Sequence, residues 1–138
     1  MKARARELKE VRRPGSDDGE RQVERAIRAM PAGDRQLAQK FHGIVRKHAP
    51  MLTPKTWYGM PAYAKEGQVL CFFQNASKFK TRYATIGFSD EANLDEGGLW
   101  PVGFAVVRLS AKEEGKIVAL LRRALTLSAV HVEARQRS

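Results

Sequence analysis

The sequence is poor in the residues that cross-link a fold or bind structural metals. Its 138 residues include one cysteine, Cys71, and three histidines. A single cysteine cannot form a disulfide within the chain, so a reducing, cytoplasmic compartment is expected. Because Cys71 lies in an apolar run, we predict that it is a small buried apolar residue. The ligands and spacing that a structural zinc site needs are missing.

Sequence motifs of catalysis are missing too. The chain has no Gly-x-Ser-x-Gly elbow, no phosphate-binding glycine loop with Lys-Ser/Thr, and no His-Glu-x-x-His. His42 and His48 are six residues apart, so on a helix they point to different faces. His131 lies near the end of the chain. We identify no catalytic residue, and the sequence favours a non-enzymatic protein.

Long apolar runs are absent as well. A membrane-spanning helix needs about 20 apolar residues, and no stretch of the sequence approaches that length. The first 13 residues are charged and contain no apolar run, which predicts the absence of a secretory signal. We expect a protein without a membrane partner.

The net charge of +10 is concentrated at the ends and in the helices. Residues 1–13 carry six Lys or Arg against two Glu, whereas residues 59–107 carry four against five acidic residues. Residues 1–19 and 128–138 are predicted to be tails that flank one domain at 20–127. Solvated surface is the simplest interpretation of the charge, and nucleic-acid contact through the tails is the alternative.

The hydrophobic pattern predicts helices before and after a run of strands. Asp34 is expected to cap the second helix, and Pro50 and Pro54 to bracket a loop after it. Ser110 and Glu113 form a capping-box pattern at the start of the last helix. Helices are expected at residues 20–29, at 34–48 and after Ser110; strands are expected at 62–65, 68–74, 79–88 and 103–108, with Glu66-Gly67 as a hairpin turn.

This order predicts an α+β fold: an antiparallel β-sheet with the N-terminal and C-terminal helices packed on one face. The second face of such a sheet is usually polar, but here both faces of the predicted strands carry apolar and aromatic residues. A loop, a second copy of the chain or a ligand must therefore cover the second face. We predict a pocket there for a flat or anionic small molecule, with a homodimer as the competing occupant. The predicted lining is Trp57, Tyr63, Phe72, Lys78, Phe79, Arg82 and Trp100.

Several of these residues belong to short motifs. They are Trp57-Tyr58-Gly59-Met60-Pro61-Ala62-Tyr63, Cys71-Phe72-Phe73, Lys78, Ile86-Gly87-Phe88, Leu99-Trp100 and the Ser110-led helix. On these motifs, residues 20–127 resemble the YdhG-like family of small domains. The resemblance implies a compact α+β domain with an antiparallel sheet. One branch of the family is described as a frataxin-like intracellular iron chaperone.

Iron is therefore the alternative ligand, and it needs an acidic surface. The helix expected at residues 34–48 carries mostly basic residues, which disfavours a cation there. The loop at residues 89–98 is acidic and rich in glycine. Carboxylates suit a hard cation, so we place the predicted metal site on this loop. Its residues are Asp90, Glu91, Asp95 and Glu96.

Overall fold

The computed structural model describes residues 17–126, from the start of the first helix below to the residue that follows the last helix. The predicted tails lie almost entirely outside this range, but residues 17–19 belong to the first helix. The helices are α2 (Asp17–Arg28), α3 (Ala32–His48), α4 (Ala76–Phe79) and α5 (Ala111–Leu125); the strands are β1 (Thr53–Trp57), β2 (Met60–Lys65), β3 (Gln68–Gln74), β4 (Ala84–Phe88) and β5 (Gly103–Val106).

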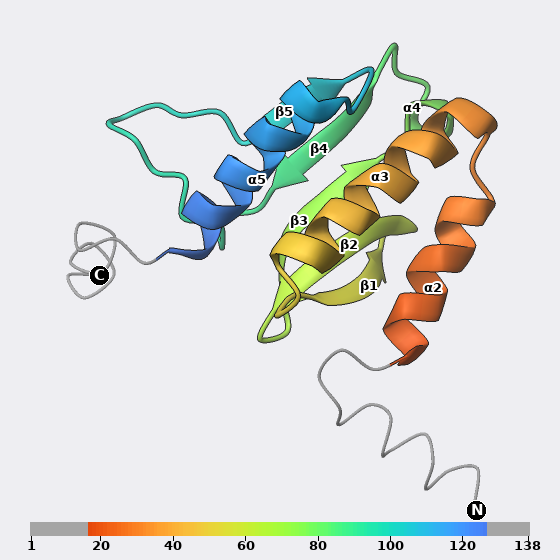
Figure 1. Ribbon diagram of the computed structural model, residues 1–138, viewed down its shortest axis with the longest axis horizontal. Helices are drawn as coiled ribbons and strands as arrows, with labels where there is room; N and C mark the ends of the chain where they lie inside the picture. Colours follow the sequence, from red (N-terminus) through yellow and green to blue (C-terminus); the bar gives the residue numbers. More distant parts are fainter. Residues whose placement is uncertain (1–16, 127–138) are drawn as a thin grey trace, which may run out of the picture.

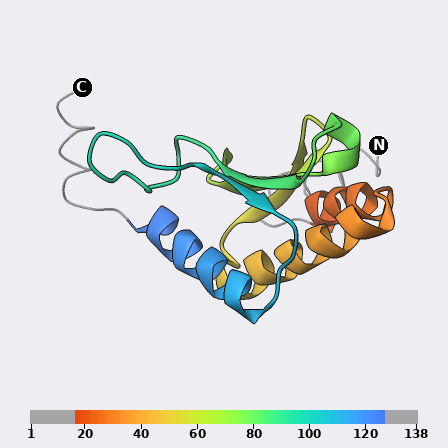
Figure 2. The ribbon, with the colours of Figure 1, turned by 90° about the horizontal axis from the view of Figure 1, so that it is seen from above.

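The five strands form one antiparallel sheet in which each strand pairs with the next along the chain. The three long helices α2, α3 and α5 lie together on one side of this sheet (Figures 1 and 2). The predicted α+β architecture, with N-terminal and C-terminal helices beside an antiparallel sheet, is therefore confirmed. None of these three helices lies on the other side of the sheet, which we call the open face.

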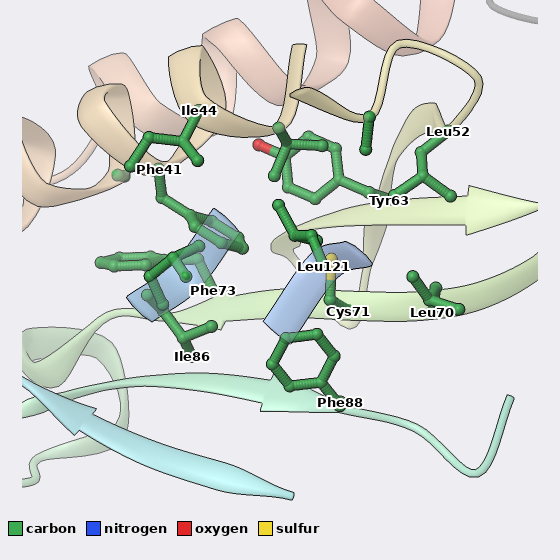
Figure 3. Close-up of a cluster of buried hydrophobic side chains, with 14 of the residues drawn as sticks. Phe41, Ile44, Leu52, Tyr63, Leu70, Cys71, Phe73, Ile86, Phe88 and Leu121 are labelled. Carbon is green, nitrogen blue, oxygen red and sulfur yellow. The ribbon is translucent and has the colours of Figure 1, made fainter. Parts of the chain in front are cut away.

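The core fills the space between the sheet and the helices (Figure 3). Phe41 of α3 packs edge-on against Tyr63 of β2, with 5.6 Å between ring centroids. Tyr63, Phe73 and Leu121 are almost completely buried in the same cluster. Cys71 is also fully buried there, as the sequence predicted.

A β-bulge in β3 adds an unexpected residue to this core. Tyr63 pairs with Cys71, but Ala64 pairs with Val69, so Leu70 is the extra residue. A bulge breaks the strict alternation of side chains between the two faces. Leu70 and Cys71 consequently belong to the same buried cluster (Figure 3). Strict alternation along the strand would place them on opposite faces.

Both short hairpins turn through left-handed backbone. Tyr58 and Gly59 join β1 to β2 with φ of 53° and 77°, and Glu66 and Gly67 join β2 to β3 with φ of 51° and 84°. Positive φ at both central residues is typical of the type I′ turn, which matches the twist of paired strands. The predicted turn at Glu66-Gly67 is confirmed.

Strand β1 is not among the predicted strands, because Pro54 indicates a loop. Pro54 pairs with Tyr63 in the sheet, and β1 is an edge strand. Proline is tolerated on an edge strand, where its missing N–H need not serve a second neighbour.

The predicted N-cap of α3 was wrong. The helix begins at Ala32, and the Pro31 carbonyl already accepts a hydrogen bond from the Arg35 N–H at 2.8 Å. Asp34 therefore lies inside the first turn. Its carboxylate instead accepts hydrogen bonds from the backbone N–H groups of Ala76 and Ser77, at 3.4 and 3.0 Å.

This contact stabilises the start of α4 and explains why the strand expected at residues 79–88 is short. The helix α4 ends at Phe79, and Lys80 follows in the left-handed conformation with φ of 54°. Strand β4 starts only at Ala84.

The C-terminal part of the fold follows the sequence closely. Strand β5 ends at Val106, two residues before the predicted limit. Ser110 and Glu113 form the predicted capping box at the start of α5. No helix among residues 17–126 is both long enough and apolar enough to cross a membrane.

Candidate functional site

The open face carries a cluster of aromatic rings at the end of the sheet where β1 turns into β2. The ring centroids of Trp57 and Phe72 are 5.3 Å apart, and those of Trp57 and Tyr58 are 5.0 Å apart. Trp57 and Phe72 are half-buried, whereas Tyr58 is 77% exposed. We call these three residues the aromatic surface.

Glycine in the neighbouring strand makes room for the Phe72 ring. Phe72 pairs with Gly87 of β4, and a Cβ atom on Gly87 would lie 2.3 Å from Phe72 Cζ. Contacts of that length do not occur, so the ring covers Gly87 only because a side chain is absent. Gly103 and Ala105 of β5 continue the open face beyond Gly87 and Thr85, and both are exposed. Beyond Phe72 this part of the face therefore carries small side chains.

A cation lies beside the aromatic surface. The Lys78 ammonium in α4 donates a hydrogen bond to the Tyr58 carbonyl at 3.1 Å. The same ammonium lies 5.6 Å from the Phe79 ring centroid. The Arg82 guanidinium lies 5.4 Å from the Tyr83 ring centroid. Cations held near aromatic faces in this way are suited to anionic ligands that also contain a flat ring.

Two of the predicted lining residues lie elsewhere. Tyr63 is fully buried on the helix side of the sheet, because the open-face positions of β2 are Met60 and Ala62. Trp100 follows the acidic loop, is half-buried and packs against the core cluster. The structure brings Trp57 and Phe72 together with Tyr58, which was not in the predicted set. It places Lys78 beside them, and Phe79 and Arg82 in the connection from β3 to β4.

One groove lies at the end of the sheet near Lys78, and another lies on the helix side of the sheet. The first, of about 340 Å³, lies between the end of α2 and α4, with Gly59 and Lys78 in its lining. The second, of about 500 Å³, lies between β5 and α5 and is lined largely by apolar side chains such as Phe104, Ile117 and Leu120. Neither groove could be predicted from the sequence, because each depends on how distant elements pack together.

The predicted metal site on the acidic loop is spread out. Asp90, Asp95 and Glu96 are exposed and Glu91 is half-buried. Glu96 pairs with Arg123 of α5 at 3.7 Å. In the part of the chain that the structure describes, these four carboxylates do not form a group of three with ligand atoms within 4.8 Å of one another.

Such a group does occur between α2 and α3. It consists of Glu20, Glu24 and His42. His42 Nε2 lies 2.7 Å from Glu20 Oε1, and Arg46 Nε lies 3.4 Å from Glu20 Oε2. The sequence signal was the spacing of Glu20 and Glu24, which places both on one helical face. Their proximity to His42 depends on how the two helices pack and could not be inferred from that spacing.

The same histidine connects this group to the core. His42 Nδ1 lies 2.8 Å from the Tyr63 hydroxyl. His42 therefore bridges Glu20, through Nε2, and Tyr63, through Nδ1. Burial raises the pKa of Tyr63 well above that of a free tyrosine, and nearby Cys71 and Glu20 raise it further. Burial also raises the pKa of the Cys71 thiol, so the thiolate that nucleophilic catalysis requires is disfavoured.

Comparison with known proteins adds no identification. No family model, no curated protein and no solved structure matches the chain. The resemblance to the YdhG-like family stays a prediction from the motifs.

Proposed function

We propose that this protein is a non-enzymatic binding module whose open face takes a flat, anionic small molecule. The observation that carries the proposal is the contact of the Trp57, Tyr58 and Phe72 rings on this face, with the Lys78 ammonium at the Tyr58 carbonyl. A flat ligand can stack on the rings while its charge lies near the ammonium.

The exposure of Tyr58 supports this role. A tyrosine in left-handed backbone is uncommon, and the type I′ turn favours Asn or Gly at that position. Tyr58 is also largely in water, so core packing does not explain its presence. A residue in this conformation lowers the stability of the fold. Residues of this kind are often found where their side chain takes part in binding.

The expected affinity is modest. Covering about 100 Å² of ring surface contributes about 2.5 kcal/mol before the costs of ordering the ligand. One exposed charge pair adds about 0.2–1 kcal/mol. We therefore expect dissociation constants of a few millimolar or weaker for a two-ring probe.

Isothermal titration with 2-naphthoate tests the proposal, with the uncharged 2-naphthylmethanol as a matched probe. We expect 2-naphthoate to bind more tightly. Lys78→Gln should weaken it about two- to fivefold, because one charge contact is lost. Lys47→Gln, which removes an exposed cation from α3, should leave the affinity unchanged. No binding of either probe, or equal effects of the two lysine variants, would contradict the proposal.

A second candidate function is the binding of a divalent metal such as Fe²⁺, as the frataxin-like branch implies. The specific observation that favours metal binding is that ligand atoms of Glu20, Glu24 and His42 lie within 4.8 Å of one another. Carboxylate and imidazole ligands suit iron and manganese, and the contact of His42 with Tyr63 orients the ring as outer partners do in metal sites. The Arg46 guanidinium near Glu20 opposes a cation there.

Anaerobic titration with Fe²⁺ distinguishes the two possible locations. If the metal binds between α2 and α3, His42→Ala abolishes the heat of binding. Replacing Asp90, Glu91, Asp95 and Glu96 together with alanine then has no effect. The reverse pattern assigns the metal to the acidic loop, and no heat with the unchanged protein excludes this candidate function.

A further inference from the structure

We infer that the open face binds single-stranded nucleic acid, with unpaired bases stacked on the aromatic surface and phosphates held by the cations around it. The inference rests on the proposed function, because it assigns a polymer of flat, anionic units to the same face. Three features of the described residues favour a polymer over a single small molecule.

The first feature is the repetition of rings and cations. Besides the aromatic surface, Lys78 lies near the Phe79 ring and Arg82 lies near the Tyr83 ring. Phe79 is 38% and Tyr83 37% exposed, so both rings are accessible. One small ring can occupy only one of these places. A nucleic-acid strand presents a flat base and a charge in every unit, and proteins that bind single strands combine stacking rings with basic side chains.

The second feature is the sign of the charge near this face. Residues 53–88, which form β1 to β4 and their connections, contain five Lys or Arg and one acidic residue. The acidic residue, Glu66, lies in the turn after Lys65. Met60, beside the aromatic surface, is at the other end of the same strand. At the end of the sheet that carries the rings, the basic residues Lys78, Lys80 and Arg82 outnumber Asp34, the acidic residue that contacts the start of α4. This excess of positive charge complements a phosphate backbone.

The third feature is the form of the surface. Rings on a sheet face can contact bases only where the faces of the bases are accessible, and in a duplex those faces are stacked inside the helix. Antiparallel sheets with exposed aromatic residues are a recurring surface for unpaired bases. The small residues Gly103 and Ala105 leave space on the open face beyond Gly87, which the Phe72 ring covers. The occupant that fits is a single strand.

Fluorescence anisotropy with a labelled 15-nucleotide oligothymidylate tests the inference on the full chain. A labelled hairpin duplex of the same length is the matched probe. We expect the single strand to bind more tightly than the duplex at 50 and 200 mM NaCl. The affinity should fall with salt, with a slope of about −0.7 in log–log units for each phosphate contact.

Three variants assign the binding to the open face. Trp57→Leu should weaken it about 5- to 150-fold, which corresponds to the loss of one stacked base. Lys78→Gln should reduce the magnitude of the salt slope by about 0.7, because one phosphate contact is lost. Lys47→Gln on α3 is the control for overall charge. The two exposed lysine variants keep the test valid if Trp57→Leu fails to fold.

Each remaining outcome decides against the inference in a distinct way. If Lys47→Gln and Lys78→Gln have equal effects, the strand is held by general charge rather than by this face. If the duplex binds as tightly as the single strand, stacking is not used. If 2-naphthoate binds and the oligonucleotide does not, the inference fails while the proposed function stands. If neither binds and Trp57→Leu lowers the sedimentation coefficient of the free protein, the face is covered by a second copy of the chain.

Discussion

Replacing Gly87 with alanine tests whether the aromatic surface depends on the missing side chain in β4. The new Cβ would lie 2.3 Å from Phe72 Cζ and 2.8 Å from both Cε atoms, so the ring must move. Overpacking of this kind costs about 1–3 kcal/mol, and alanine returns about 0.5–1 kcal/mol because glycine is costly to order in a strand. We expect Gly87→Ala to lower the free energy of unfolding by up to about 2.5 kcal/mol.

Its paired residue on β5 provides the control. A Cβ on Gly103 would meet only Thr85 Cγ2, at 4.0 Å, which is an ordinary contact. Gly103→Ala should therefore be neutral or stabilise the fold by up to about 1 kcal/mol. Urea unfolding of both variants measures the difference. If the two free energies agree within about 0.5 kcal/mol, the packing of Phe72 over Gly87 is not as described.

Three other perturbations have defined outcomes. Tyr58→Asn creates the Asn-Gly pair that type I′ turns favour, so the free energy of unfolding should be unchanged or rise by up to about 1 kcal/mol. The binding of 2-naphthoate should weaken. A loss of stability would show that Tyr58 is structural. Asp34→Ala should lower the free energy of unfolding by about 1 kcal/mol and speed amide exchange at Ala76 and Ser77. Asp34→Asn keeps a hydrogen-bond acceptor and should lower the free energy of unfolding less. Unchanged amide exchange would contradict this capping role. Alkaline pH should destabilise the fold, because the unfolded thiol loses its proton above about pH 9 while the raised pKa of buried Cys71 keeps it protonated in the folded state. The stabilisation that the protonated Cys71 thiol provides is fully present below pH 9 and falls by about 1.4 kcal/mol per pH unit above it. In urea unfolding, the free energy of unfolding of Cys71→Ala should therefore decline less between pH 9 and 10 than that of the unchanged protein. An equal decline in the two proteins would refute this cause.

Local patterns in the sequence predicted the features whose cause is local. The capping box of Ser110 and Glu113 and the turn at Glu66-Gly67 each depend on neighbouring residues, and both are present. The α+β order of elements also followed from local periodicity. The edge strand β1 was missed because Pro54 disfavours a strand in general and is tolerated only at a sheet edge, which the sequence does not reveal.

Features with distant causes could not be predicted. Asp34 looks like a cap of its own helix, but its carboxylate is used by α4, 42 residues further along the chain. Tyr63 belongs to the same motif as Trp57, yet the pleat of β2 places it in the core, where it contacts His42. The contact between Glu20 and His42 could not be predicted from the sequence either, because it depends on the packing of α2 against α3.

The most direct test of the open face as the binding surface is a nuclear magnetic resonance titration that follows the indole N–H signals of the two tryptophans. Trp57 lies in the aromatic surface, whereas Trp100 packs against the core, and a Trp100→Phe variant assigns the two signals. Addition of 2-naphthoate should shift the Trp57 signal progressively and leave the Trp100 signal in place. A shift of the Trp100 signal alone, or of neither signal, would contradict the account.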